Sequence, residues 1–333
     1  MSIEVTAFKG SEKNGIVESK TQREGPTGNE VLIKVTHSGI CGTDEHYKHA
    51  DMVLGHEGVG VIEQIGDKVT QLKVGDVVGW GYVQKTCGEC EQCLLGQDQY
   101  CEKVEIYGFH SLHQGSFGSH AIWDASFVFK IPEGLAPEDA APLMCGGATV
   151  FEVIEAYNIR PTQRVGVIGV GGLGHLAIQF LSKMGASVVV FSSTDSKREE
   201  ALRLGASEFC ATRDKKSFDV AKLDHLLVTT SFMPNWVPYL DVMKPKSTIY
   251  PLTVDFNDLV VPVMRLVAAG IDIQGSTVSS RSVMKRMLDF AARNHIKPMI
   301  ETFPLTKAGV EEGMTRLREG KMRYRGVLVA GAA

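Results

Sequence analysis

The amino-acid sequence predicts an α/β protein built from a β-rich domain and a doubly wound parallel sheet. The chain of 333 residues is longer than one ordinary hydrophobic core requires, so two domains are expected. Short apolar segments separated by glycine and proline fill its first part. From about residue 147 onward, apolar strands alternate with helical segments, which is typical of a parallel sheet covered by helices on both faces.

The β-rich part contains short apolar segments bounded by turn residues. Glycine and proline recur between these segments, as in a barrel-like all-β domain. The predicted strands are Val31–Val35, Gly58–Ile65, Val74–Val78 and Phe127–Ile131.

The alternating part begins with a buried strand at 164–169 and a helix at 172–184. A strand at 187–191 and a helix at 196–204 follow, and Cys210 is expected to be a core residue of the third strand. Further strands are predicted at 224–228, 248–252 and 271–274, and a strand-like segment at 326–330 ends the chain after a helical stretch.

The charge and the apolar content of the chain exclude several kinds of partner. The formal net charge is −4, so no electrostatic attraction to nucleic acid or to an anionic membrane is expected. The first ten residues lack the pattern of a secretory leader, and no apolar stretch approaches the ~18 residues of a membrane span. We therefore expect a cytoplasmic protein that acts on a small molecule.

Four of the seven cysteines lie within fifteen residues, at Cys87, Cys90, Cys93 and Cys101. In an intracellular enzyme such a cluster is more often a metal site than a set of disulfides. C-x2-C loops let neighbouring thiolates converge on one tetrahedral zinc ion, and four thiolates leave no open position. The cluster predicts a structural zinc site. An iron–sulfur cluster stays open, because thiolates alone do not select the metal, and four free thiols are the simplest alternative.

The pattern G-x-G-x-x-G occurs at Gly169, Gly171 and Gly174. The pattern is weak alone, but here it follows an apolar strand and opens a helix. The glycines let the backbone approach a pyrophosphate, and the helix N-terminus offers free N–H groups. A glycine-rich turn without a ligand is the alternative. The pattern predicts a Rossmann cofactor loop that includes Gly172 and Leu173.

The end of the second strand of this sheet indicates which cofactor binds. NAD-binding versions place an acid there to hold the ribose hydroxyls. Here Ser192 and Ser193 occupy the strand end, and Lys197 and Arg198 follow, while Asp195 is interpreted as a loop residue. Hydroxyls and cations accept a 2′-phosphate that an acid would repel, so the sequence favours NADP(H). The alternative is that both cations are solvated helix charges.

Three dispersed segments carry further candidate metal ligands, CGTD at 41–44, GHEG at 55–58 and MCGG at 144–147. A catalytic zinc needs three protein ligands and one open position for substrate or water, and two thiolates with an imidazole suit it. Spacing alone does not pair these residues, and a single cysteine is often only a small buried apolar residue.

Together these motifs resemble the zinc-dependent medium-chain dehydrogenase/reductase superfamily, and most closely its cinnamyl-alcohol-dehydrogenase-like branch. The resemblance covers nearly the whole chain and also includes GHEGVGVIEQIG at 55–66, PLMCGGATVF at 142–151, GVGGLGHLAIQF at 169–180 and SSTDSKREEAL at 192–202. It implies a GroES-like catalytic domain of residues 1–147 and 285–333. Residues 148–284 would form the Rossmann cofactor-binding domain.

The resemblance also implies the catalytic zinc site. Cys41, His56 and Cys145 would bind this zinc, which makes two zinc ions per chain with the structural one. Glu57 would lie just behind the metal. Asp44 would hydrogen-bond the second nitrogen of His56 and so fix its tautomer.

Three more residues are given roles by the same resemblance. Thr43 would hydrogen-bond the substrate oxygen, His46 would end a proton relay, and Arg325 would contact cofactor phosphate. Each has a simpler alternative, because a threonine after a strand can cap a turn, His46 can be a surface histidine and Arg325 a surface cation.

The implied activity is hydride transfer between NADPH and aromatic or medium-chain aldehydes, by an enzyme expected to be a homodimer. Polyol or sugar dehydrogenases, which also carry CGTD, are the rival reading, and some relatives reduce C=C or C=N bonds. A non-catalytic nucleotide-binding protein could keep the fold, although the three zinc ligands argue against it. An apolar pocket including Trp80 and Val83 would favour aldehydes, and converging polar groups would favour polyols.

The sequence departs from the family pattern near the catalytic zinc site. Only fifteen positions separate Cys41 from His56, so the loop that forms one wall of the pocket in relatives is short here. Gly42 replaces a larger, often basic residue that contacts the pyrophosphate in many alcohol dehydrogenases.

Overall fold

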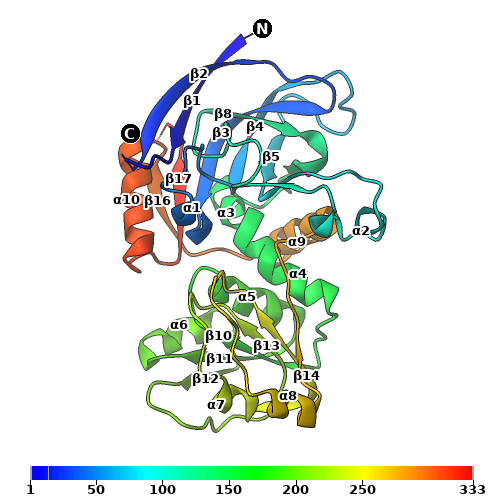
Figure 1. Ribbon diagram of the computed structural model, residues 1–333, viewed down its shortest axis with the longest axis vertical. Coiled ribbons are helices and arrows are strands. Elements are labelled where there is room, and N and C mark those ends of the chain that lie inside the picture. Colours follow the sequence, from blue (N-terminus) through cyan, green and yellow to red (C-terminus); the bar gives the residue numbers. More distant parts are fainter. Residues whose placement is uncertain (1, 14, 332–333) are drawn as a thin grey trace. The chain divides into compact units, whose positions relative to one another are not determined.

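The computed structural model describes residues 2–13 and 15–331, which separate into two compact units. The first unit comprises the chain up to Ala148 together with the chain from Val278 onward, and the second is Thr149–Thr277 (Figure 1). The first is β-rich and the second is a doubly wound parallel sheet, so the predicted fold class is confirmed. In the described part of the chain, no helix combines the length and apolar character of a membrane span.

A seven-stranded sheet forms the centre of the first unit. Its strand order is β16 (Ile300–Pro304), β17 (Arg325–Val329), β3 (Glu30–Ile40), β4 (Gly58–Ile65), β5 (Val77–Trp80) and β9 (Phe129–Lys130), with β8 (His120–Asp124) also paired to β3. Two small sheets pair β1 (Ser2–Lys9) with β2 (Val17–Glu24) and β6 (Val83–Lys85) with β7 (Glu105–Ile106).

Short helices connect these strands or cover the sheet. They are α1 (Gly42–His46), α2 (Glu91–Leu94), α3 (Pro137–Pro142), a π-helix (Leu143–Gly147), α9 (Arg281–Asn294) and α10 (Lys307–Arg318), with 3-10 turns at Asp98–Tyr100 and Ala125–Phe127. The π-helix contains Cys145, and single-turn π segments inside α-helical stretches are frequent at functional sites.

The predicted strand at Val74–Val78 is wrong at its start. Val74 lies in a turn and is 58% exposed, and Gly75 has a positive φ of 90°. The strand begins only at Val77. The apolar pattern is misleading here because Val74 is itself a turn residue, separated from the strand by Gly75 and Asp76. The hairpin of β1 and β2 was not predicted, since most β2 residues are polar and partly exposed.

Two tryptophans fill the core beneath the main sheet. The ring centroids of Trp80 and Trp123 are 5.9 Å apart, and both side chains are buried. A side chain at Gly58 would collide with the ring of Trp80, so glycine is required at the start of β4. Val83 is buried in the same cluster. The expectation that Trp80 and Val83 line a substrate pocket is therefore not supported, because both belong to the core.

The second unit is built on six parallel strands. Their order is β12 (Glu208–Ala211), β11 (Ser187–Ser192), β10 (Arg164–Ile168), β13 (Leu223–Val228), β14 (Met243–Pro251) and β15 (Asp272–Ile273). The helices of this unit are α4 (Ala148–Ala156), α5 (Gly174–Met184), α6 (Arg198–Arg203), α7 (Trp236–Leu240) and α8 (Val263–Ala269), and Asp195–Lys197 is a 3-10 turn. Cys210 is buried in β12, the third strand in chain order within this sheet.

The strand order places a switch point between β10 and β13. The chain winds outward on one side from β10 to β12 and then returns to add β13 on the other. In doubly wound sheets a ligand binds outside the carboxyl ends of the strands at this point. The glycine loop that follows β10 lies there.

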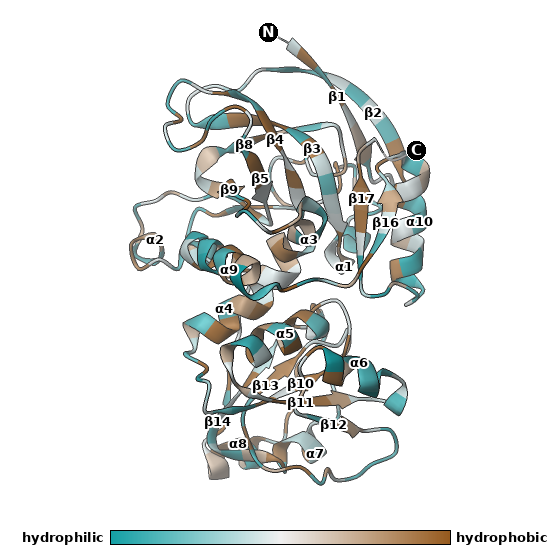
Figure 2. Cartoon of the chain, turned by 180° about the vertical axis from the view of Figure 1, so that it is seen from behind, coloured by the Kyte–Doolittle hydropathy of each residue, from teal (hydrophilic) through white to brown (hydrophobic). Residues whose placement is uncertain are grey.

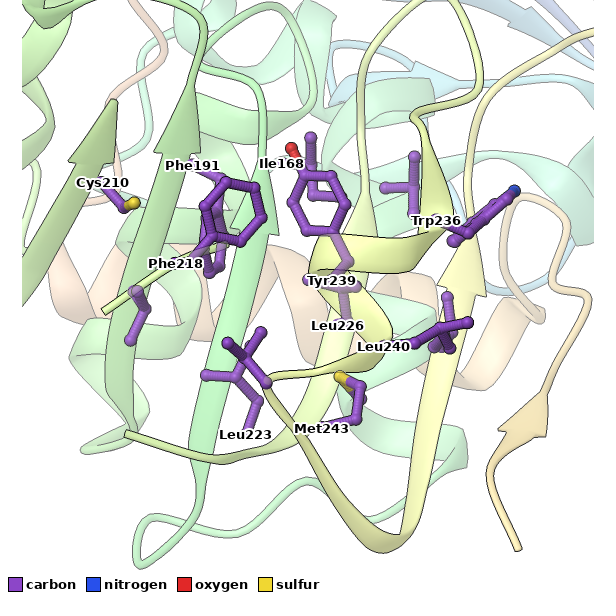
Figure 3. Close-up of a cluster of buried hydrophobic side chains, with 14 of the residues drawn as sticks. Ile168, Phe191, Cys210, Phe218, Leu223, Leu226, Trp236, Tyr239, Leu240 and Met243 are labelled. Atoms are coloured by element: carbon purple, nitrogen blue, oxygen red, sulfur yellow. The ribbon is translucent and has the colours of Figure 1, made fainter. Parts of the chain in front are cut away.

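Apolar side chains fix the sheet of the second unit from one face. Figure 3 shows Phe191, Phe218 and Tyr239 grouped together, and their ring centroids lie 4.8–5.3 Å apart. Leu226 of β13 belongs to the same buried cluster. Figure 2 shows the corresponding pattern, with apolar strands β10 and β13 and a mostly hydrophilic α6. The central strands of the second unit are buried on both faces, and for this reason their sequences are mostly continuous apolar runs.

We predict that Leu226→Ala destabilises the protein by about 3 kcal/mol, because it leaves a cavity among fully buried side chains. The matched control is Leu202→Ala in α6, where the leucine is 44% exposed and the expected change is below about 0.5 kcal/mol. Urea unfolding followed by circular dichroism measures both. Equal effects of the two substitutions would contradict the assignment of this core.

Candidate active site and metal centres

The cysteine lobe, residues 87–101, brings four thiols together. The Sγ atom of Cys93 lies 3.6 Å from that of Cys90 and 4.0 Å from that of Cys87, and the Cys87 and Cys101 sulfurs are 3.5 Å apart. All four sulfurs lie within 4.8 Å of one another. Two sulfurs sharing one tetrahedral zinc at about 2.3 Å each are separated by just under 4 Å, so the cluster has the size of a four-thiolate site.

Backbone N–H groups turn toward these sulfurs. Cys87 N donates to Cys101 Sγ at 3.4 Å, Cys90 N to Cys87 Sγ at 3.4 Å, and Lys103 N to Cys101 Sγ at 3.3 Å. Such donors favour the thiolate form, and the N–H of Cys93 is the main reason that the pKa of Cys90 is lowered to about 6. The lobe is therefore suited to a closed metal site.

A second cluster joins Cys41, His56, Glu57 and Cys145, whose ligand atoms also lie within 4.8 Å of one another. Cys41 directly follows β3, and His56 and Glu57 directly precede β4. Cys145 belongs to the π-helix Leu143–Gly147. Three segments that are distant in the sequence thus converge at one point of the first unit.

The imidazole of His56 is held from one side and open on the other. Its Nδ1 atom lies 3.0 Å from Oδ1 of Asp44, and both side chains are fully buried. Its Nε2 atom is buried without a hydrogen-bond partner. A buried imidazole nitrogen that faces two thiols is best explained as a metal ligand, because an unsatisfied polar atom is otherwise costly. The residues present therefore fit a catalytic zinc.

The two thiols of this cluster differ in character. The hydrogen bond with Cys145 is the main reason that the pKa of Cys41 is well below its usual value, whereas the same contact and burial raise the pKa of Cys145. Of the two thiols, Cys41 is therefore the one that more readily forms a thiolate. Thiolates are the form that zinc binds, so metal binding here releases protons.

Glu57 and Arg325 form a buried ion pair next to the thiols. Burial raises the pKa of Glu57 to about 7, although the guanidinium of Arg325 opposes the increase. The Nε atom of Arg325 has no hydrogen-bond partner. The sequence reading gave Arg325 a contact with cofactor phosphate; the structure shows it on Glu57, and the phosphate contact stays a prediction.

Thr43 and His46 both lie on α1, directly after Cys41. The Oγ1 atom of Thr43 is 3.7 Å from Cys41 Sγ, and His46 is exposed at the last position of the helix. The short loop that follows is tied to the end of β1, since Ser11 N donates to Lys48 O at 3.0 Å and Gly10 N to Met52 O at 2.9 Å. The loop is thus ordered by the N-terminal hairpin.

The glycine loop of the second unit has the geometry of a phosphate cradle. Gly169 has a φ of 95°, which favours glycine, and a Cβ at Gly174 would collide with the carbonyl oxygen of Gly169. At Gly171 an added Cβ would meet only open space. The loop therefore leaves room above Gly171, where a pyrophosphate could approach the backbone at the start of α5.

The predicted 2′-phosphate residues lie at the end of β11 and on the turn that follows it. Ser193 is exposed, and Lys197 donates to the carbonyl oxygen of Val170, in the glycine loop, at 2.6 Å. Arg198 donates to Asp195 at 2.6 and 2.8 Å and lies over the ring of Phe209. Asp195 thus orients Arg198, a contact that the sequence did not indicate.

The sequence also missed Tyr107, which lies against the second cluster. Its ring centroid is 4.7 Å from that of His56, and its hydroxyl donates to Asp44 at 3.0 Å. No spacing rule connects it with the motifs at 41–44 or 55–58. The one available signal was its position six residues after Cys101, which keeps Tyr107 close to the cysteine lobe in the sequence.

Comparison with known proteins identifies the family of the chain. Residues 27–133 match the alcohol dehydrogenase GroES-like domain, and residues 172–293 match the zinc-binding dehydrogenase domain. The probable formaldehyde dehydrogenase AdhA of Bacillus subtilis is 35% identical over 93% of both chains.

Solved structures agree with this result. A cinnamyl alcohol dehydrogenase from Sorghum bicolor superposes with a TM-score of 0.90 at 31% identity, covering 98% of this chain and 97% of that one. A cinnamyl alcohol dehydrogenase from Helicobacter pylori, solved with NADP(H), gives 0.89 at 26% identity and 99% coverage of both chains.

These relatives confirm the predicted resemblance, the activity class and the choice of zinc and NADP(H) as cofactors. The residue roles and the domain boundaries stay predictions. The chain belongs to the zinc-dependent alcohol dehydrogenases of the medium-chain dehydrogenase/reductase superfamily, next to the cinnamyl alcohol dehydrogenases.

Proposed function

We propose that the protein is an aldehyde reductase that transfers hydride from NADPH to aromatic or medium-chain aldehydes. The observation that carries this proposal is the buried cluster of Cys41, His56 and Cys145, in which the Nε2 atom of His56 has no protein partner. Three such ligands leave a fourth position for a substrate oxygen. A zinc ion held by these residues would supply Lewis acidity at that oxygen, and a bound nicotinamide would supply the hydride.

The first unit supplies the proton. We assign the proton transfer at the substrate oxygen to the hydroxyl of Thr43, which lies beside Cys41. We assign the exchange of that proton with solvent to His46, because its imidazole is exposed at the end of the same helix, α1. Glu57 and Arg325 balance charge behind the thiolates, and Asp44 keeps His56 in the tautomer whose Nε2 is free to bind metal.

The second unit holds the cofactor. We assign the pyrophosphate to the loop of Gly169, Gly171, Gly172, Leu173 and Gly174. The 2′-phosphate is assigned to Ser192, Ser193, Lys197 and Arg198. Support comes from the open space at Gly171 and from the contact of Lys197 with the same loop.

The rival functions differ in substrate rather than in fold. A polyol or sugar dehydrogenase would use the same ligands, and a reductase of C=C or C=N bonds would use the same cofactor. Trp80 and Val83 do not discriminate between them, because both are buried in the core. The assignment to aldehydes therefore rests on family likeness, and a substrate panel decides it.

We further propose that the enzyme is a cytoplasmic homodimer. β15 is the outermost strand of its sheet. Exposed apolar side chains gather in the segment before it, at Val254, Phe256, Val260, Val263, Met264 and Val267. A second copy that pairs with this edge would cover them and extend the sheet across a two-fold axis. All seven cysteines are unpaired, as expected in a reducing compartment.

The zinc assignment predicts about two zinc ions per chain by elemental analysis. Cys145→Ser should lose about one zinc and nearly all turnover, and Cys90→Ser should lose the other and lower the melting temperature. Cys210→Ser is the matched control, since this buried cysteine lies outside both clusters. Full zinc content and turnover in Cys145→Ser would disprove the catalytic site.

The cofactor assignment predicts that kcat/KM is at least ~10-fold higher with NADPH than with NADH. Ser193→Asp should lower the NADPH value by about 100-fold, because a carboxylate repels the 2′-phosphate. Ser207→Asp, at the opposite end of the strands, should change neither value. Absorbance assays with aromatic aldehydes, straight-chain aldehydes and polyols measure both the cofactor preference and the substrate preference. A preference for NADH, or for polyols, would refute the corresponding part of the proposal.

The dimer proposal predicts a solution mass of twice 36.3 kDa by light scattering. Phe256→Glu should yield monomer, because it places a charge in the proposed interface at a residue that is 86% exposed in one chain. Phe109→Glu, at another exposed phenylalanine, should remain dimeric. A monomeric parent protein would rule out the proposal.

A further inference from the structure

We infer that Tyr107 is a positioning residue for the metal ligand His56, and that it connects this ligand to the cysteine lobe. The inference rests on the proposed zinc site and goes beyond it, because Tyr107 contacts neither metal nor substrate in this scheme. It acts on the carboxylate that orients the imidazole.

The hydroxyl of Tyr107 both donates and accepts a hydrogen bond. The residue is fully buried at the end of β7. Its Oη atom donates to Oδ1 of Asp44 at 3.0 Å and accepts from Gly55 N at 3.0 Å.

Asp44 receives its other donors from the metal-binding segments themselves. Cys41 N donates to Oδ2 at 2.9 Å, and Gly55 N donates to Oδ1 at 3.2 Å. The Nδ1 atom of His56 lies 3.0 Å from the same Oδ1 atom. Tyr107 and His56 therefore share one carboxylate oxygen, and the phenol fixes the acceptor to which the imidazole is bound.

The ring of Tyr107 restrains the imidazole from a second direction. The two ring planes are inclined by 32° with centroids 4.7 Å apart. Tyr47 packs edge-on against Tyr107 at 5.5 Å, and a side chain at Gly108 would collide with Tyr47. The glycine after Tyr107 thus lets Tyr47 approach, and the phenol ring has little freedom to turn.

The stem of β6 and β7 joins Tyr107 to the cysteine lobe. Lys85 pairs with Glu105 and Val83 with Ile106, and Tyr107 N donates to Tyr82 O at 2.9 Å. Beyond the paired Lys85 and Glu105, the stem opens into the lobe, where Cys87 and Cys101 face one another at 3.5 Å. A metal that fixes these two sulfurs closes one end of the stem, and Tyr107 lies at the other end.

The test is Tyr107→Phe, which keeps the ring and removes only the hydroxyl. We expect the catalytic zinc to pass to a chromogenic chelator about 10–100-fold faster, because loss of an outer partner of a metal ligand typically lowers metal affinity by that factor and weaker binding speeds release. The visible absorption of cobalt placed in the catalytic site should also shift, because the imidazole changes orientation. A merely structural role would not move that spectrum. Zinc in the lobe should be retained.

Tyr250→Phe is the matched control. It removes a buried phenol that lies 3.1 Å from another histidine, His225, in the second unit. This variant should keep the parental zinc release rate and cobalt spectrum. The inference is overturned if Tyr107→Phe also behaves like the parent, or if both variants change alike. A parent protein whose zinc content does not fall on Cys145→Ser would instead refute the proposed catalytic site.

The connection to the lobe is tested by a double-mutant cycle. Cys90→Ser should speed the release of catalytic zinc in the parent, because the stem loses its closed end. In the Tyr107→Phe background the same change should add much less, since the path through the hydroxyl is already cut. Full additivity of the two effects, or no effect of Cys90→Ser on the catalytic zinc, would overturn this part.

Discussion

The buried carboxylate of Asp44 is the constraint on which the catalytic unit depends. A carboxylate removed from water has to be satisfied by donors, and here they come from Cys41, Gly55, His56 and Tyr107. Asp44 therefore holds the ends of β3 and β7 and the segment before β4 in one arrangement. That arrangement is also the one that brings two metal-binding residues together. Folding of this region therefore also brings together two of the proposed metal ligands.

The positive charge beside the thiol cluster comes from Arg325, which lies on β17 near the end of the sequence. β17 pairs with β3, with Gly326 opposite Ile40, and so places Arg325 next to the segment that carries Cys41. Glu57 is ion-paired with that arginine while it shares the thiol cluster. A metal site with two thiolates and a carboxylate nearby accumulates negative charge. A buried cation that is fixed by backbone pairing offsets this charge without entering the metal shell.

The parts of the site that the sequence predicted are those in which chemistry and spacing are local. The C-x2-C loops of the lobe and the glycines at 169–174 each carry their geometry within a few residues. Cys41, His56 and Cys145 came together only through family resemblance, because strand pairing creates their proximity. The contacts of Tyr107 with Asp44 and of Arg325 with Glu57 were missed for the same reason. Val74 was misassigned because an exposed turn can carry valines.

The two cysteine-containing sites differ in how many elements of the fold contribute to them. The lobe is partly exposed, and backbone N–H groups of the lobe itself donate to its sulfurs. The cluster at Cys41 is buried and cannot be completed without β3, β4, β17 and the π-helix. A closed site of the first kind would stabilise a short stem that is marginal alone, since strands of three and two residues bury little surface. The stem in turn places Tyr107 where the second site needs a donor. The structural metal would then have a consequence for catalysis without any contact with substrate.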